Sequence, residues 1–188
     1  MLIAQQKRRE NIAEYLLYMW QVEDLLRACQ LDDARIDHLL VARFVAMDGV
    51  TEEQLTEARR WYRELRDMML TEGLREGGHL QINRNILIDL TDLHQRLLRH
   101  GQDALYTSAY YATLPYIVEL RAKAPEPKGE LETCFDALYG LMVLRLEGRD
   151  VTDATRAAMQ QIAKLLGLLA EKHRLWKAGQ LPELDKEE

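Results

Sequence analysis

The fold class is decided by residues 130–146, which read ELETCFDALYGLMVLRL. The stretch is long and mostly apolar, and its polar members are few. Leucine and methionine suit helices because they keep most of their rotamer freedom there. Gly140 in the middle indicates a close approach between helices rather than a break. We therefore predict a helix over residues 130–146 and expect it to be the most buried helix of the protein.

Composition extends this prediction to the whole chain. The 188 residues are 47% hydrophobic and 30% charged, and they include only 10 glycines and 4 prolines. This length and hydrophobic content match one globular domain that buries its own core. No stretch shows the alternating pattern of a strand. We predict an all-α, single-domain bundle of six or seven helices over residues 1–178, followed by an acidic tail at 179–188.

Apolar side chains at spacings of three and four residues predict the other helices. Their expected ranges are 5–30, 33–46, 51–70, 83–99, 103–124 and 152–177. Thr51 and Gln54 match a capping box, and Asn83 and Thr152 are the expected N-caps of two further helices. Pro115 lies inside the 103–124 pattern, so this segment is either one kinked helix or two helices that meet.

The helical phase also predicts which side chains face inward and which face outward. In the 33–46 helix the inward residues are expected to be Ile36, Leu39, Leu40 and Phe44. In the 51–70 helix three arginines are expected on the outer side: Arg59, Arg63 and Arg66.

Charge and hydropathy exclude several classes of protein. The formal net charge is -6, and the densest basic run, Lys7-Arg8-Arg9, is followed by Glu10, so we expect no nucleic-acid partner. The N-terminal residues lack the apolar region of a signal peptide. The longest apolar run, residues 137–144, is too short to span a bilayer, so we expect no membrane association and a cytoplasmic location.

The motifs of common enzyme classes are missing from the sequence. Cys29 and Cys134 lie far apart without a metal-binding spacing, and we expect both to be reduced, packed thiols. Glu76 and His79 give the only Glu-x-x-His match, across two glycines, so we expect no metal and no cofactor. No P-loop, nucleophile elbow or dinucleotide-binding fingerprint occurs. The sequence therefore leans toward a protein without enzymatic activity.

Polar residues on apolar helix faces are the candidate ligand-binding residues. A helical wheel places four of them there: Glu23, His94, Glu132 and Arg145. Because an unpaired buried charge costs several kcal/mol, roughly, each needs a partner. We expect His94 and at least two of the other three to be buried in one hydrogen-bonded region. Such a region is either a network that fixes helix register or a ligand pocket between helices.

His79 is a further candidate because it follows Gly77 and Gly78 and precedes a helix N-terminus. Helix N-termini attract anions, so an anion site is one interpretation of this position. A loop histidine that packs against its neighbours is the other.

Several stretches are more particular than a generic helical bundle requires. They are residues 10–20, 78–83, 90–94, 110–115, 118–123 and 130–135, for example ENIAEYLLYMW at 10–20 and GHLQIN at 78–83. Together they resemble a family of uncharacterised proteins of about this length from Bacteroidota, known only as a domain of unknown function. The resemblance covers nearly the whole chain and implies a bacterial, cytoplasmic, all-helical protein. It implies no activity, substrate or catalytic residue.

Two classes of function remain open. The first is an interaction module, which forms a homodimer or binds another protein, with the 5–30 helix as the preferred contact. The second is a small-molecule binding protein or enzyme with a pocket between helices. An extended apolar surface favours the first class, whereas a concave pocket in which two or more of the candidate residues converge favours the second.

Overall fold

The structure, a computed structural model, describes residues 2–45 and 49–181. Every regular element in these residues is a helix, so the all-α class is confirmed. Contacts divide the chain into two compact units, one of residues 1–8 and 15–85 and one of residues 9–14 and 86–188. The single domain over 1–178 stays a prediction. The expected helix end at Ala46 and the part of the acidic tail beyond Leu181 lie outside the described residues.

The first helix is shorter than the sequence pattern predicted. The chain forms α1 (Leu2–Glu10) and then α2 (Ile12–Ala28), with a break at Asn11. The Asn11 Oδ1 atom accepts the N–H groups of Ala13 and Glu14, each at 3.1 Å, and so caps α2. The prediction of one helix over 5–30 is wrong for this reason. With the continuous helical residues 33–45 counted as one segment, the described residues form eight helical segments rather than six or seven.

A π-helical turn interrupts the second helical segment. The chain runs from α3 (Asp33–Ile36) through η1 (Asp37–Val41) into α4 (Ala42–Val45). Such a turn shifts the helical phase by about one residue. As a result Ile36 and Leu40 are buried as predicted, Phe44 is half-buried, and Leu39 is 45% exposed. The inward prediction for Leu39 is wrong because Val41 takes the buried position after the phase shift.

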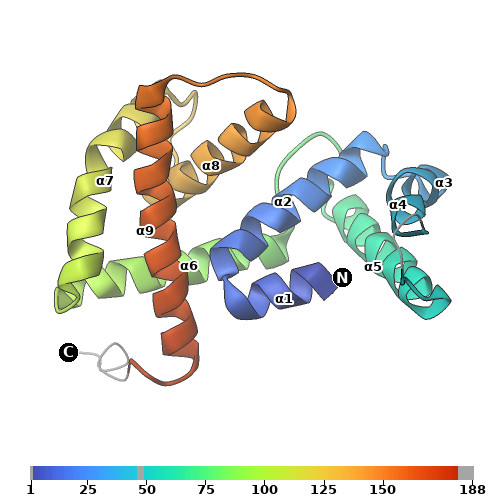
Figure 1. Cartoon of the computed structure of the whole chain (residues 1–188), viewed down its shortest axis with the longest axis horizontal. Helices are drawn as coiled ribbons and strands as arrows, with labels where there is room; N and C mark the ends of the chain where they lie inside the picture. Colours follow the sequence, from blue (N-terminus) through green and yellow to red (C-terminus); the bar gives the residue numbers. More distant parts are fainter. Residues whose placement is uncertain (1, 46–48, 182–188) are drawn as a thin grey trace. The chain divides into compact units, whose positions relative to one another are not determined.

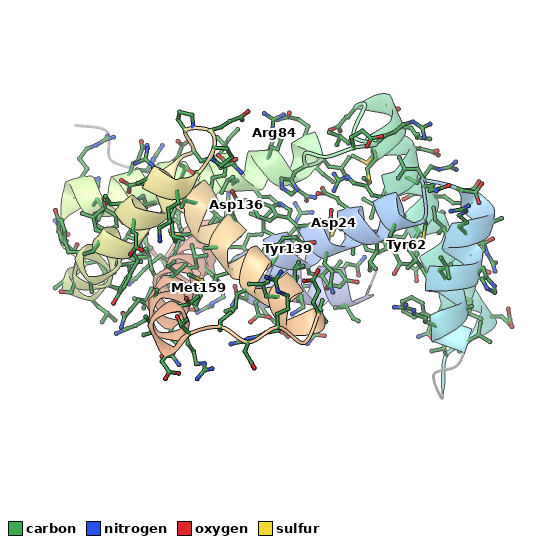
Figure 2. The ribbon with its side chains drawn as sticks, turned by 90° about the horizontal axis from the view of Figure 1, so that it is seen from above. Asp24, Tyr62, Arg84, Asp136, Tyr139 and Met159 are labelled. Carbon is green, nitrogen blue, oxygen red and sulfur yellow. The ribbon has the colours of Figure 1, made fainter. Side chains whose placement is uncertain are left out.

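Helix α5 (Glu52–Thr71) begins at the predicted capping box. The N–H of Gln54 donates to the Thr51 hydroxyl at 3.2 Å, and the Thr51 N–H donates to the Gln54 side chain at 2.9 Å. The buried stripe of α5 contains Leu55, Ala58, Tyr62, Leu65 and Met69. The ring of Tyr62, labelled in Figure 2, packs 6.4 Å from the ring of Phe44.

The arginines of α5 form ion pairs with aspartates of the preceding helical segment. Arg59 and Arg63 each donate to the Asp37 carboxylate at 3.1 Å, and Arg66 pairs with Asp33 at 2.9 Å. The expected outward position is wrong for Arg66, whose side chain is 18% exposed, whereas the side chains of Arg59 and Arg63 stay 41% and 42% exposed. The two aspartates lie one helical turn apart, so their carboxylates present a single acidic face to α5.

The second unit contains most of α6 (Gln81–His100) together with α7 (Ala104–Lys123), α8 (Glu130–Leu146) and α9 (Asp153–Lys177). Helix α9 packs against α7 and α8, and α7 also packs against α8 (Figure 1). Helix α7 is one helix that contains Pro115, which settles the alternative left by the sequence. Thr152 caps α9 as predicted, because its hydroxyl accepts the N–H of Thr155 at 3.1 Å.

Helix α8 is not the most buried helix, which corrects the expectation from its composition. Its buried residues are Leu131, Thr133, Cys134, Phe135 and Leu141. The last turns of α8 are half-buried or exposed, and Leu146 is 71% exposed. Helix α2 buries a longer set: Ile12, Ala13, Tyr15, Leu16, Met19, Trp20, Val22, Glu23 and Leu26. Within the described residues no helix is long and apolar enough to cross a membrane.

Candidate functional site

The first polar cluster surrounds Glu23, a fully buried carboxylate on α2 of the first unit. Its Oε1 atom accepts the backbone N–H of Leu80 at 3.0 Å and the side-chain amide of Asn83 at 2.7 Å. Its Oε2 atom lies 2.6 Å from Nδ1 of His79. The predicted burial of Glu23 is confirmed, and its partners come from the loop before α6 and from the first turn of α6.

The Glu23 carboxylate occupies the N-terminal end of α6. The first N–H groups of a helix have no partner within it and carry partial positive charge, so a carboxylate there is stabilised. Asn83 was expected to cap this helix, but α6 begins at Gln81 and the Asn83 side chain is fully buried. The N–H of Gln81 donates to a second carboxylate, that of Glu72, at 2.8 Å. The carboxylates of Glu23 and Glu72 therefore accept backbone N–H groups at the start of α6.

The loop before α6 is held by Arg27 and Trp20 of α2. The Arg27 guanidinium donates to the carbonyl oxygen of Leu74 at 3.1 Å and also to that of Gly78. Gly78 has a φ of +84°, a conformation that side chains disfavour. The His79 ring stacks on the Trp20 ring with centroids 4.1 Å apart. His79 therefore packs against its neighbours, and Glu23 fills the position where an external anion was one expectation.

The second polar cluster surrounds His94 on α6, in the second unit. His94 is 5% exposed, so its predicted burial is confirmed. Its Nδ1 atom is hydrogen-bonded to the hydroxyl of Tyr106 on α7 at 2.6 Å, and its Nε2 atom lies 3.8 Å from Oε2 of Glu130 on α8. The hydroxyl of Tyr110 donates to the same Glu130 oxygen at 3.0 Å. This cluster thus joins three helices through side chains from each.

Burial sets the protonation states in the His94 cluster. Burial lowers the pKa of His94, and the nearby Glu130 carboxylate opposes this only in part, so the imidazole is neutral at pH 7. Burial raises the pKa of Tyr110 to about 12, with a further contribution from Glu130. Burial also raises the pKa of the neighbouring Cys134 thiol to about 12. Since the thiol stays protonated, it has none of the character of a reactive cysteine.

Glu132 and Arg145 do not join either cluster. The Glu132 side chain is 42% exposed, and its Oε1 atom lies 4.0 Å from Nζ of Lys128. Arg145 is exposed. The prediction that His94 would be buried with at least two of the other three residues is wrong, because only Glu23 meets it. Glu23 and His94 also have entirely different hydrogen-bonding partners, so no single connected region contains them.

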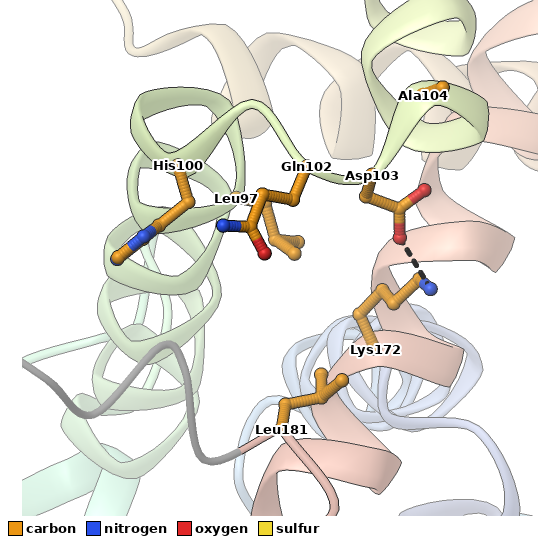
Figure 3. A pocket seen from close by; sticks show the side chains of 7 residues that line it. All are labelled: Leu97, His100, Gln102, Asp103, Ala104, Lys172 and Leu181. Carbon is orange, nitrogen blue, oxygen red and sulfur yellow. Dashed lines mark ion pairs between the residues drawn. The ribbon is translucent and has the colours of Figure 1, made fainter.

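A pocket of about 300 Å³ lies in the second unit where α6 ends and α7 begins (Figure 3). Its lining residues are Leu97, His100, Gln102, Asp103, Ala104, Lys172 and Leu181. Asp103 caps α7 by accepting the N–H of Tyr106 at 2.9 Å, and it also forms an ion pair with Lys172. Burial alone would raise the pKa of Asp103, but Lys172 and the α7 N–H groups outweigh it and lower the pKa. None of the four candidate residues lines this pocket.

An apolar groove lies between α8 and α9 and encloses about 450 Å³. Its lining residues are Leu138, Leu141, Met142, Arg145, Leu146, Arg156, Met159, Gln160 and Ala163. Arg145 is the one of the four candidate residues that reaches it. Among residues 2–45 and 49–181, no three His, Cys, Asp or Glu side chains are placed to hold a metal ion.

The fold and these clusters define a small all-helical protein with two buried polar networks, one around Glu23 and one around His94. The comparisons identify it further: the chain belongs to the family "Domain of unknown function (DUF4924)", whose model matches residues 1–180. No curated protein and no solved structure matches the chain. The resemblance to an uncharacterised domain family is thereby confirmed.

Proposed function

We propose that this protein is a non-enzymatic interaction module that forms a homodimer through the outward face of α7. The observation that carries the proposal is the composition of α7, which has apolar side chains on its exposed side as well as on its buried side. Leu105, Tyr111 and Val118 are 59%, 63% and 56% exposed. A helix that is apolar all round is normally covered on all sides.

The exposed residues of α7 have the spacing of a helix–helix contact. One row of exposed positions recurs at alternating spacings of three and four residues along the helix: Leu105, Ser108, Ala112, Pro115, Glu119 and Ala122. Tyr111 and Val118 lie beside this row. Such alternation is typical of the seam between two packed helices. The small side chains of Ala112 and Pro115 at its centre allow a close approach of a second helix. A helix of this length is about 30 Å long, which is enough for a continuous contact.

A second copy of the chain is the occupant that suits this face. The six positions are symmetric about the helix centre, so an antiparallel copy related by a two-fold axis pairs each residue with a complementary one. Leu105 then meets Ala122, and Ala112 meets Pro115. Glu119, the charged member of the seam, meets Ser108 rather than another carboxylate, so the pairing brings no like charges together.

Burial within the chain also argues against α2 as the dimer contact. Most of the apolar side chains of α2 are already buried within one chain. The alternative class, a ligand pocket built from the candidate residues, loses its basis because these residues do not converge. The proposal also includes a further protein partner, a cytoplasmic location and an origin in Bacteroidota. These parts rest on the composition and on the resemblance.

Sedimentation velocity over a range of concentrations tests the proposal. We expect the wild type to form a species of twice the 21.9 kDa chain mass. Ala112→Arg places two guanidinium groups at the two-fold axis and should give monomers, because like charges there repel. Ala157→Arg, the same substitution at an exposed position of α9, is the matched control and should leave the dimer intact.

Three results would contradict the proposal. A wild-type chain that stays monomeric at the highest concentration removes the homodimer. A dimer that survives Ala112→Arg removes α7 as its contact. Dissociation by Ala157→Arg to the same degree shows that any added charge is sufficient and removes the specific seam.

A further inference from the structure

The groove between α8 and α9 has the features of a site for a small amphipathic ligand. Its floor is apolar and contains Leu138, Leu141, Met142, Leu146, Met159 and Ala163. Met159 of α9 is labelled in Figure 2. A volume of about 450 Å³ lies within the range of roughly 300–1,000 Å³ that is typical of small-molecule sites. Met142 and Met159 also favour ligand binding, since flexible thioethers adapt to irregular apolar ligands.

Two guanidinium groups line the same groove, and the unpaired one gives it a charge preference. Arg156 of α9 is paired with Asp153 at 2.9 Å, at the first turn of α9. The Arg145 guanidinium of α8 has no ion-pair or hydrogen-bond partner in residues 2–45 and 49–181. An arginine with no partner beside an apolar surface offers its planar donors to a carboxylate. The protein as a whole carries a net charge of -6, so this local positive charge runs against the overall balance.

We propose that the α8–α9 groove binds a free medium-chain fatty acid, with the acyl chain on the apolar floor and the carboxylate on the Arg145 guanidinium. The acyl chain covers Leu138, Met142 and Met159, which accounts for the apolar side chains that α8 leaves uncovered in its last turns. Arg145 supplies two parallel N–H donors to the carboxylate oxygens, whereas Arg156 on the other wall is already paired with Asp153. The site does not depend on the homodimer proposed above, since it is formed by other helices.

Methyl NMR with selectively labelled methionine tests this site directly, because Met142 and Met159 report on the groove. The probe is dodecanoate, added below its micelle concentration to the full chain, and dodecanol is the uncharged comparison. We expect dodecanoate to shift the methyl signals of Met142 and Met159 but not that of Met69, which is buried in α5 of the other unit. Dodecanol should bind at least tenfold more weakly, because it forms no ion pair with arginine.

Two variants separate a specific site from general binding to apolar surface. Arg145→Gln should weaken dodecanoate binding about tenfold, the effect of losing one charge-assisted contact at an exposed site. Arg149→Gln is the matched control, since Arg149 is 68% exposed, pairs with Glu147 and does not line the groove. Ala163→Trp fills the groove from an exposed position of α9 and should abolish the shifts at Met142.

Each contrary result overturns the proposal. Unchanged Met142 and Met159 signals at saturating dodecanoate exclude the groove as the site. Equal affinities for Arg145→Gln and Arg149→Gln exclude the guanidinium contact, and equal affinities for dodecanoate and dodecanol exclude recognition of the carboxylate.

Discussion

Replacing Glu23 tests whether the buried carboxylate stabilises the start of α6. The side chain is fully buried and interacts with the Leu80 N–H, the Asn83 amide and the His79 ring. Glu23→Ala leaves these groups without a partner and also opens a cavity. Breaking a buried charged contact in this way costs about 3–5 kcal/mol. Glu23→Gln keeps the volume and one acceptor oxygen, so we expect it to cost about 2 kcal/mol, at the scale of one charged hydrogen bond.

Urea unfolding followed by far-ultraviolet circular dichroism measures these free energies of unfolding. Glu64→Gln is the matched control, because Glu64 is 63% exposed and makes only a surface pair with Arg60. An exposed pair of this kind is worth about 0–1 kcal/mol, so the control should lie close to the wild type. A Glu23→Ala variant within 1 kcal/mol, roughly, of the wild type would refute the reasoning, because the carboxylate would then be dispensable for the α6 end.

Three further substitutions test other contacts of the fold. Burial lowers the pKa of His94 in the folded state below its ordinary 6.5, so the unfolded chain binds more protons and the wild type should lose stability as the pH falls through about 6.5. In urea titrations at about pH 7.5 and about pH 5.5, His94→Gln should reduce the difference in unfolding free energy between the two pH values. An unchanged difference would contradict the assignment of this pH dependence to His94. Asp103→Ala removes both the α7 cap and the pair with Lys172 and should cost about 1 kcal/mol more than Asp103→Asn, which keeps a capping oxygen; equal losses would mean that the cap contributes nothing. Thr51→Ala should cost about 1 kcal/mol at the start of α5, against a negligible loss for the exposed Thr56→Ala in the same helix.

Helix ends were predictable where a side chain marks them and the apolar pattern also stops. Thr51 and Thr152 meet both conditions, and both caps form as predicted. Asn11 meets only the first, because apolar residues continue at helical spacing through residues 5–30 and hide the break. The signal that could have found it is Asn11 followed three residues later by Glu14, the spacing of a capping box. The Asn11 amide in fact donates to the Glu14 carboxylate at 3.3 Å.

The candidate polar residues show what a helical wheel can and cannot predict. The wheel correctly placed Glu23 and His94 on buried faces, since α2 and α6 are covered along the stripes that contain them. It failed for Arg145 because the last turns of α8 are apolar but uncovered, so an apolar stripe there does not mean burial. It also says nothing about which helices are neighbours. The contacts of Glu23 with His79 and Asn83, and of His94 with Tyr106 and Glu130, could therefore be identified only from the structure.

The arginines of α5 show that charge patterns on two helices carry more information together than separately. Arg59, Arg63 and Arg66 recur at spacings of four and three, and considered alone they resemble a solvated helix face. Asp33 and Asp37, four residues apart in the preceding helical segment, present the complementary stripe. Each pair is partly exposed and worth little by itself. A shift of α5 by one residue, however, would turn its arginines by about 100° and break every pair at once. The main effect of the arginine and aspartate stripes is therefore to fix the register of α5 against η1. Apolar contacts alone define this register less strictly.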